Sequence, residues 1–348
     1  MSGRQPTRGR ILARLAVTLA LLASLAWWLD LTQVAMRLGQ IRLSWVLAAL
    51  ALSVLQVAGA AWRWSYTAGR LGLVLPFRHA LREYYLATFL NQVLPGGLAG
   101  DVSRAWRHAQ TVATGPAVRA VVLERAVGHV VMVGLTVASG ILLLMRSGHA
   151  DRPSATLVVA IAVTAGVAVM LWVRAGGRGG AWSRSWPWPL PGWRWLSWVR
   201  ALGRDARVAV FSSETFVPQI VSSLGIALSF LITYVFAARA VGIETSLVVL
   251  LPLVPPVLMS MVIPFTVAGW GVREGTAGLL WSAAGLSASD GVALSVTYGV
   301  LVFLSTLPGA VILARLAGQV KVKQDVVTEP KMAAGWPQGV VERRDRVE

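Results

Sequence analysis

The side chains best suited to chemistry lie in two broken stretches of an otherwise apolar sequence. The first stretch spans 94–104 and the second spans 263–274. Each begins with a hydrophobic residue and a proline, continues through glycines, and ends with two nearby residues of opposite charge. These charged residues are Asp101 and Arg104 in the first stretch, and Arg273 and Glu274 in the second. The shared pattern indicates that the two stretches form a pair.

Arginines beside a glycine-rich turn are suited to binding a phosphate group. The planar guanidinium offers a fork of donors that matches phosphate oxygens, and the free amides at the start of a helix point toward an anion. We therefore expect Arg104 and Arg273 to contact a phosphate, while Asp101 and Glu274 orient them or respond to protonation. The alternative is that each pair is a buried salt bridge that holds its turn together.

Three further residues complete the candidate site. Glu124 and Arg125 are neighbours in an apolar run, and adjacent helical side chains point about 100° apart, so each needs its own partner. We expect one to meet Asp101 or Arg104 and the other to reach the headgroup region. Asn91 is either a hydrogen-bonding group of the cavity or a helix cap near the break. The full set of candidate substrate-binding residues is Asn91, Pro95, Gly96, Gly97, Gly100, Asp101, Arg104, Glu124, Arg125, Pro264, Gly269, Gly271, Arg273 and Glu274.

The elements that position these residues must lie in a membrane. Hydrophobic residues make up 56% of the 348-residue sequence and charged residues 14%, which is typical of an integral membrane protein. The net charge of +17 would suggest nucleic acid in a soluble protein, but membrane topology explains its distribution better. Broken backbone is tolerated in lipid only where protein or water satisfies its amides, and paired broken segments indicate a transport site between repeats.

Residue types exclude or disfavour several kinds of chemistry. The sequence has no cysteine, so disulfides, thiolate catalysis and cysteine-metal sites are excluded. Its four histidines lack the spacing of a metal site, and it has no P-loop for a nucleotide. We therefore expect no metal, no cofactor and no catalytic residue.

The hydrophobic pattern predicts an all-α polytopic membrane protein with about eight transmembrane helices and two Gly/Pro-broken re-entrant segments. A crossing requires about 20 residues, so the apolar run 84–94 is expected to enter the membrane and turn back at the Pro-Gly-Gly sequence that follows. Pro252, Pro255 and Pro256 predict a kinked or discontinuous helix. The expected spans lie near 15–29, 43–61, 120–145, 155–173, 216–238, 247–264, 275–286 and 292–316.

The flanks of the first two spans have distinct expected roles. The run Trp62-Arg63-Trp64 ends the second span and is suited to anchoring at the headgroup level. An amphipathic basic segment at 63–82 follows and is expected on the cytoplasmic surface. The first apolar run is an uncleaved helix or, as the alternative, a signal peptide.

The charge distribution predicts a cytoplasmic N-terminus. With eight spans, most of the 32 lysines and arginines fall on the cytoplasmic side, as the positive-inside rule requires, and the C-terminus is cytoplasmic as well. This arrangement belongs to the cell (inner) membrane. It brings both broken stretches to the cytoplasmic face, which indicates a parallel repeat unless one span is misplaced. The short segment at 275–286 is the weakest candidate for a span.

At three places the sequence resembles a known family. These are Asn91–Arg107, Glu124–Gly128 and Pro264–Glu274. They resemble the flippase-like membrane domain of lysylphosphatidylglycerol synthetases and of stand-alone bacterial and archaeal proteins, and the resemblance covers about Arg10 to Leu316. It implies a bundle with re-entrant segments that moves lipids or lipid-linked molecules between leaflets.

The hydrophobic pattern and the resemblance together divide the chain. We expect a basic cytoplasmic N-terminus at 1–14, a flippase-like transmembrane domain at 15–316 with a Trp/Arg-rich cytoplasmic loop at 174–207, and a mobile cytoplasmic tail at 317–348. Synthetases of this family carry a cytoplasmic domain that transfers an aminoacyl group to phosphatidylglycerol, and the tail is too short for such a domain. The expectation is therefore that the chain is not an enzyme.

The expected function is translocation of a lipid or lipid-linked molecule, with its headgroup held by Arg, Asp and Glu in a polar cavity. The resemblance leaves the cargo open, because relatives differ in proposed cargo. The expected partners are membrane lipids, either an anionic phospholipid or a polyprenyl- or hopanoid-type lipid, and no nucleic acid. Two alternatives stay open: a membrane glycosyl or lipid-headgroup transferase, and a non-transporting scaffold whose Trp/Arg-rich loop docks a partner. A homo-oligomer or a partner biosynthetic enzyme is compatible with each.

Overall fold

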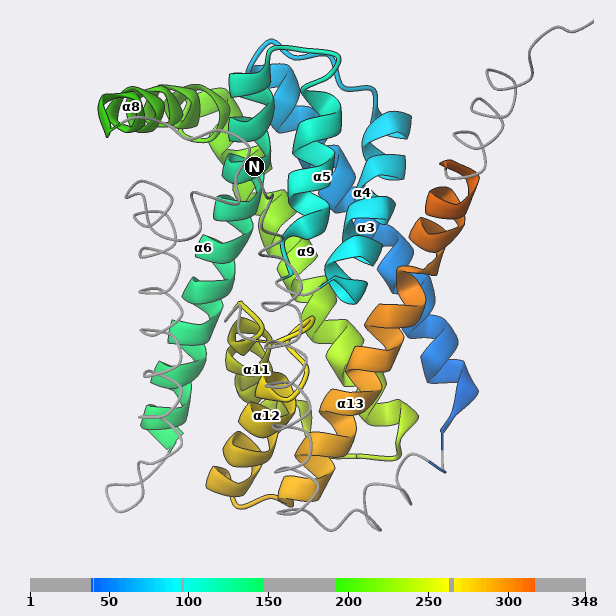
Figure 1. The fold of residues 1–348 in the computed structure, drawn as a ribbon. Helices are drawn as coiled ribbons and strands as arrows, with labels where there is room; N and C mark the ends of the chain where they lie inside the picture. Colours follow the sequence, from blue (N-terminus) through cyan, green and yellow to red (C-terminus); the bar gives the residue numbers. More distant parts are fainter. Residues whose placement is uncertain (1–38, 40, 95–96, 147–191, 263–265, 317–348) are drawn as a thin grey trace, which may run out of the picture.

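The computed structural model describes residues 39, 41–94, 97–146, 192–262 and 266–316, and every regular element in these ranges is helical. The predicted all-α class is therefore confirmed for the described part of the chain (Figure 1). The elements are α3 (Leu43–Arg70), α4 (Phe77–Val93), α5 (Ala99–His108), α6 (Thr114–Arg146), α8 (Gly192–Ala209), α9 (Ser213–Ala240), α10 (Leu247–Leu250), η1 (Leu251–Leu253), α11 (Val254–Ser260), α12 (Val272–Ala283) and α13 (Ala288–Ser305). A last helical segment covers 307–316.

Four helices in the described ranges are long and apolar enough to cross a membrane. They are Leu43–Arg70, Thr114–Leu143, Ser213–Ala240 and Ala288–Leu316, and they correspond to four of the expected spans. The expected spans at 15–29 and 155–173, the N-terminal segment at 1–14 and the tail at 317–348 lie outside the described residues. The expected count of eight spans thus stays a prediction.

The helix α3 is longer than the span expected at 43–61. It continues to Arg70 without a break at the Trp-Arg-Trp run. Of that run, Trp62 is exposed, whereas Arg63 and Trp64 are buried. The interpretation of Arg63 as a headgroup anchor was therefore wrong, because partners from other helices compensate its charge inside the bundle. The later basic residues of the expected surface segment at 63–82, Arg70, Arg78 and Arg82, are exposed.

The helices α3 and α9 form an antiparallel pair along the length of the bundle. At one end, the Arg42 N–H donates to the Ala240 carbonyl at 2.8 Å. At the other end, Arg70 and Glu214 form an ion pair at 2.8 Å. Between them, the Gln56 amide donates to the Thr233 hydroxyl at 2.7 Å. The end of α3 therefore lies beside the start of α9.

Both helices of this pair end in the same kind of cap. After α3, Gly72 has a φ of +74° and the Leu73 N–H donates back to Ala68. After α9, Gly242 has a φ of +71° and the Ile243 N–H donates back to Ala238. A left-handed glycine after the last turn satisfies the free carbonyls and turns the chain away from the helix axis. Each cap directs the chain into a short hairpin.

The first hairpin consists of α4 and α5, which run in opposite directions. Near the tip, the Gly100 N–H donates to the Asn91 side chain at 2.8 Å, and near the base Arg107 pairs with Glu83 at 3.0 Å. The helices approach so closely that a Cβ on Gly100 would lie 1.8 Å from the Ala87 carbonyl oxygen. A glycine at this position is therefore required by the packing of the hairpin.

The second hairpin consists of α10, η1 and α11 on one side and α12 on the other. The prolines at 252, 255 and 256 accompany a change from α-helix to 3-10 helix and back, so the predicted discontinuous helix is confirmed. The chain then turns through Ala268, Gly269 and Gly271, whose φ values are all positive. The residues Leu247–Ser260 are a short apolar helical run, and α12 has 12 residues.

The two hairpins begin at opposite ends of the bundle. The first follows the end of α3 and the second follows the end of α9, which is antiparallel to α3 (Figure 1). The chain then returns along α13 to the first hairpin. There Gly309 packs so closely against α4 that a Cβ on it would lie 2.2 Å from the carbonyl oxygen of Tyr85. The sequence predicted that both broken stretches approach the same face, whereas in the described bundle the hairpins that carry them begin at opposite ends.

The helix α8 lies in the region expected as a Trp/Arg-rich loop at 174–207, of which residues 174–191 lie outside the described part. It runs across the end of the bundle where α9 begins (Figure 1). An ion pair of 2.5 Å between Asp205 and Arg119 joins it to α6. Its exposed basic residues are Arg200, Arg204 and Arg207.

Candidate functional site

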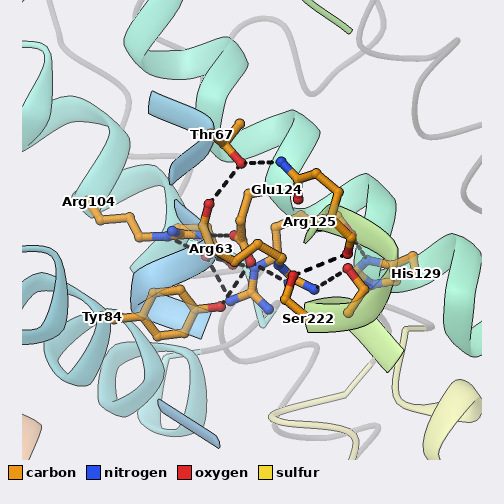
Figure 2. A network of polar contacts seen from close by, with 11 residues as sticks. Arg63, Thr67, Tyr84, Arg104, Glu124, Arg125, His129 and Ser222 are labelled. Carbon is orange, nitrogen blue, oxygen red and sulfur yellow. Dashed lines mark hydrogen bonds and ion pairs between the residues drawn. The ribbon is translucent and has the colours of Figure 1, made fainter. Parts of the chain in front are cut away.

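Six residues of the first hairpin and its neighbours form one polar network, which we call the first charge cluster. Its members are Arg63, Asn91, Asp101, Arg104, Glu124 and Arg125. They come from α3, α4, α5 and α6, so the network joins the hairpin to two long helices (Figure 2). Five of the six were predicted as site residues, and Arg63 was not.

Glu124 is the centre of this cluster. One carboxylate oxygen accepts from Arg63 at 2.5 Å and the other accepts from Arg104 at 2.6 Å. The Tyr84 hydroxyl donates to the first oxygen at 3.3 Å. One side chain of α6 thus connects α3, α4 and α5.

Asp101, in the first turn of α5, likewise accepts hydrogen bonds from several helices. Its Oδ1 accepts from Arg104 Nε at 2.9 Å and from Arg125 Nη2 at 2.8 Å, and its Oδ2 accepts from the Asn91 amide at 3.2 Å. Glu124 and Arg125 therefore have different partners, as adjacent helical positions require: Arg63 and Arg104 for Glu124, and Asp101 for Arg125. The prediction was that only one of the two would meet Asp101 or Arg104, whereas both do.

Asn91 acts as a cap across the break in the first hairpin. Its side-chain oxygen accepts the N–H of Gly100, in the first turn of α5, where Leu98 at the N-cap makes no side-chain hydrogen bond. The first N–H groups of a helix have no partner within it, so Asn91 satisfies one of them from α4. Of the two predicted roles for Asn91, the capping role is the one that these contacts support.

Aromatic rings replace water around the guanidinium of Arg104. Its central carbon lies 4.6 Å from the ring centre of Trp64 and 4.6 Å from that of Tyr84. Arg125 lies 5.8 Å from the same Tyr84 ring. The faces of aromatic rings attract a cation, and this attraction offsets part of the cost of burying Arg104.

The five charged side chains differ in their access to the protein surface. Those of Arg104 and Glu124 have no exposed area, and those of Arg63 and Asp101 have little. Arg125 is 33% exposed. In this conformation Arg104 is a buried brace, as in the salt-bridge alternative, whereas Arg125 is paired with Asp101 and partly exposed.

Arg63 is the functional residue that the sequence reasoning missed. Besides Glu124, it donates to Ser223 of α9 at 2.8 Å. Gly128 leaves room for it, because a Cβ at that position would lie 3.1 Å from Arg63 Nη2. The sequence did contain a signal for Arg63, since a charged residue within an apolar helical run is a functional candidate by default.

The second hairpin carries a smaller network, which we call the second charge cluster: Gly271, Arg273, Glu274 and Ser295. Arg273 pairs with its neighbour Glu274 through Nε at 3.0 Å and also through Nη2. Ser295 of α13 accepts from Arg273 Nε at 3.0 Å. Glu274 also accepts the Gly271 N–H at 2.6 Å, so the carboxylate stabilises the start of α12.

Close packing encloses Arg273 as completely as Arg104. Its guanidinium lies 4.9 Å from the Trp270 ring and 5.6 Å from the Tyr298 ring. A Cβ on Gly299 would lie 2.1 Å from Arg273 Nη2, so only glycine fits there. Arg273 and Glu274 are each only 1% exposed, and in this conformation they too form a buried brace.

The predicted site residues therefore lie in two clusters. Ser223 contacts the first cluster and Tyr234 lies beside Tyr298 near the second, which places the clusters about 16 Å apart along α9 from the helical rise. Gly97, Gly269 and Gly271 lie at the tips with positive φ values. The predicted Pro95, Gly96 and Pro264 lie outside the described residues. In the described part of the chain, no group of His, Asp and Glu side chains is arranged to hold a metal ion.

The apolar spans, the opposed hairpins and the buried charge clusters define a multi-pass membrane protein with a polar interior. The family described as the lysylphosphatidylglycerol synthase TM region matches residues 11–309, and the chain belongs to this family. The predicted family is thus confirmed, over nearly the range expected. No curated protein matches the chain.

Proposed function

We propose that this chain moves a lipid or lipid-linked molecule between the leaflets of the cell membrane, with the headgroup handled at the tips of two re-entrant hairpins. One observation carries the proposal: two short hairpins begin at opposite ends of the antiparallel α3–α9 pair, and each brings a buried charge cluster into an apolar bundle. Membership of this family supports it.

The lengths of the hairpin helices favour re-entry over crossing. At about 1.5 Å per residue, α4 with 17 residues extends about 25 Å and α12 with 12 residues about 18 Å. Crossing the hydrocarbon requires about 30 Å. Backbone that breaks inside the membrane must be surrounded by protein or water.

The opposed hairpins resemble the organisation of transporters with inverted repeats. In such proteins the substrate site lies near the midplane, where broken helices meet and point their N-termini at anionic groups. Both α5 and α12 begin at a hairpin tip, so their positive dipole ends face the middle of the bundle.

The distribution of basic residues favours a cytoplasmic position for the end of α3. Many exposed arginines lie at that end, whereas the opposite end, which carries Arg42 and Arg239, is less basic. The positive-inside rule assigns the more basic end to the cytoplasm. The first hairpin then enters from the cytoplasm and the second from outside. The basic residues at the cytoplasmic end include Arg70, Arg78, Arg82, Arg200, Arg204 and Arg207.

We propose transport without a catalytic step. In the two clusters each described carboxylate already accepts hydrogen bonds from arginine, and Glu274 also from a backbone N–H. A general base needs a free position within reach of the substrate proton. Neither a transferase nor a scaffold is favoured by a specific contact in the described residues.

Transport of fluorescent phosphatidylglycerol in proteoliposomes tests the proposal. Dithionite added outside bleaches only outer-leaflet label, so the rate of complete bleaching measures translocation. We expect wild type to translocate faster than protein-free vesicles, and Arg273→Ala and Glu274→Ala to lose this activity. Arg204→Ala, an exposed change on α8, is the matched control and should retain it.

Folding must be checked separately, because removal of either partner leaves a buried charge unpaired. Variants that elute as monodisperse protein and still lose transport support the proposal. Equal rates with wild type, both variants and protein-free vesicles, across phosphatidylglycerol, a polyprenyl phosphate and phosphatidylcholine, would contradict it.

A further inference from the structure

The first charge cluster contains more positive than negative groups. Three arginines, Arg63, Arg104 and Arg125, share two carboxylates, Asp101 and Glu124. The nearby Arg107–Glu83 pair adds no net charge. The second charge cluster has one arginine and one glutamate. Of the two charge clusters, only the first therefore has an unbalanced positive charge.

Both carboxylates of the first cluster are saturated by donors. Asp101 accepts from two arginines and from Asn91. Glu124 accepts from two arginines and from Tyr84. An incoming ammonium group would have to displace one of these donors and would lie among three guanidinium groups.

Unused donors remain in the same cluster. Arg104 Nη1 and Arg63 Nε are buried and have no hydrogen-bond partner among the residues that the structure describes. A buried donor without a partner is costly, and an anion is the group that would supply one. Arg125, at 33% exposed, connects this interior to the accessible surface.

We infer that the first charge cluster binds an anionic phosphate headgroup, with Arg125 as its entry contact, and rejects a headgroup that carries an added aminoacyl ammonium. The consequence of this inference for transport rests on the proposed function. The inference itself names the charge class of the cargo. Lysyl-phosphatidylglycerol, with two ammonium groups and one phosphate, carries a net positive charge, so it would add repulsion to a cluster that already has an excess of arginine.

Lipid retention by the purified full-length chain tests the inference without requiring transport. Native mass spectrometry of delipidated protein in detergent would compare phosphatidylglycerol, phosphatidylcholine and lysyl-phosphatidylglycerol with identical acyl chains. We expect wild type to retain phosphatidylglycerol about tenfold better than either other lipid, which is the discrimination of one good charge contact. Inorganic phosphate at millimolar concentration, as a competitor, distinguishes a free-phosphate site from a headgroup site.

Variants at Arg125 locate the preference. Arg125→Gln should retain the three lipids equally, and Arg125→Lys, which keeps the charge, should retain part of the preference. Arg42→Gln is the matched control, because it removes one charge from an exposed pair at the other end of the bundle, and it should behave as wild type. Thermal unfolding of each variant identifies any that has lost its fold.

Four outcomes of these measurements count against the inference. Equal retention of the three lipids by wild type would overturn it, as would preference for lysyl-phosphatidylglycerol, an unchanged preference in folded Arg125→Gln, or complete displacement by inorganic phosphate. Arg125-dependent retention of phosphatidylglycerol without translocation would refute the transport function and leave the inference standing. Translocation of all three lipids at equal rates would support the transport function and contradict the inference.

Discussion

Glu124 joins three other helices through a single carboxylate. It has no exposed area, and it pairs with Arg63 at 2.5 Å and with Arg104 at 2.6 Å. A buried charge of this kind contributes to specificity more than to net stability, but loss of one partner leaves the others uncompensated. Glu124 is therefore important because its removal would take a counter-ion from two buried arginines, Arg63 and Arg104.

We predict that Glu124→Gln destabilises the protein by about 3–5 kcal/mol, because two buried arginines lose their counter-ion. The fluorescence of the 16 tryptophans during thermal unfolding in detergent measures the change. Glu244→Gln is the control: Glu244 pairs with Arg42 on the surface with a side chain 70% exposed, and such a pair contributes about 1 kcal/mol or less. Similar unfolding temperatures for both variants would show that Glu124 does not hold the cluster together.

At this scale, residue types and spacing predicted five of the six members of the first charge cluster. They did so because a charge in an apolar segment must have a partner. They could not pair the members, since Arg63 and Glu124 are far apart in the sequence and meet only through the packing of α3 on α6. Arg63 also lay beside two tryptophans, which made an interfacial anchor the simpler interpretation.

The first hairpin depends on close contact between its two helices. Gly100 packs against the backbone of Ala87, and Asn91 caps the start of α5 from the opposite helix. Together these contacts fix the position of Asp101, one residue after Gly100, beside Arg104 and Arg125. The geometry of the charge cluster thus follows from the packing of α4 on α5.

We predict that Gly100→Ala separates α4 from α5, because the new Cβ would lie 1.8 Å from the Ala87 carbonyl oxygen. Overpacking of this kind costs about 1–3 kcal/mol, and transport should fall with it because Asp101 moves. The control is Gly134→Ala in α6, where nothing lies within 4 Å of the added Cβ. That change should be neutral or stabilising, by up to about 1 kcal/mol. Comparable loss of thermal stability in both variants would argue against a packing role for Gly100.

The sequence predicted which elements are broken more reliably than where they end. Pro252, Pro255 and Pro256 predicted a kinked or discontinuous helix, because each removes a backbone donor and disfavours a straight helix. The end of α3 was placed too early, because hydropathy counts Arg63 as a surface residue whatever its partners. The helix α8 was expected as a loop, since its many arginines and tryptophans gave no clear apolar period.

The whole molecule combines an inverted arrangement of elements with unequal charge. The helices α3 and α9 end in the same glycine cap and lead into hairpins at opposite ends. The first hairpin carries three arginines in its cluster and the second carries one. The two hairpins therefore follow their long helices in the same way, whereas the affinity for an anion is expected to be greater on the side of the first hairpin. Counting spans along the sequence could not give this arrangement, because it depends on the antiparallel packing of α3 on α9.

Single-cysteine labelling separates a hairpin from two crossings, and the chain has no native cysteine to interfere. Val74→Cys lies after α3, Glu244→Cys lies after α9, and Val262→Cys lies at the tip of the second hairpin. An impermeant maleimide should label Glu244→Cys from outside and Val74→Cys only from the cytoplasmic side. Eight crossings would bring Val262→Cys to the cytoplasm and make it as reactive there as Val74→Cys. A re-entrant hairpin keeps that cysteine within the membrane, so we expect it to react far more slowly from the cytoplasmic side. Equal reactivity would mean that this stretch crosses the bilayer and that the two repeats are not inverted.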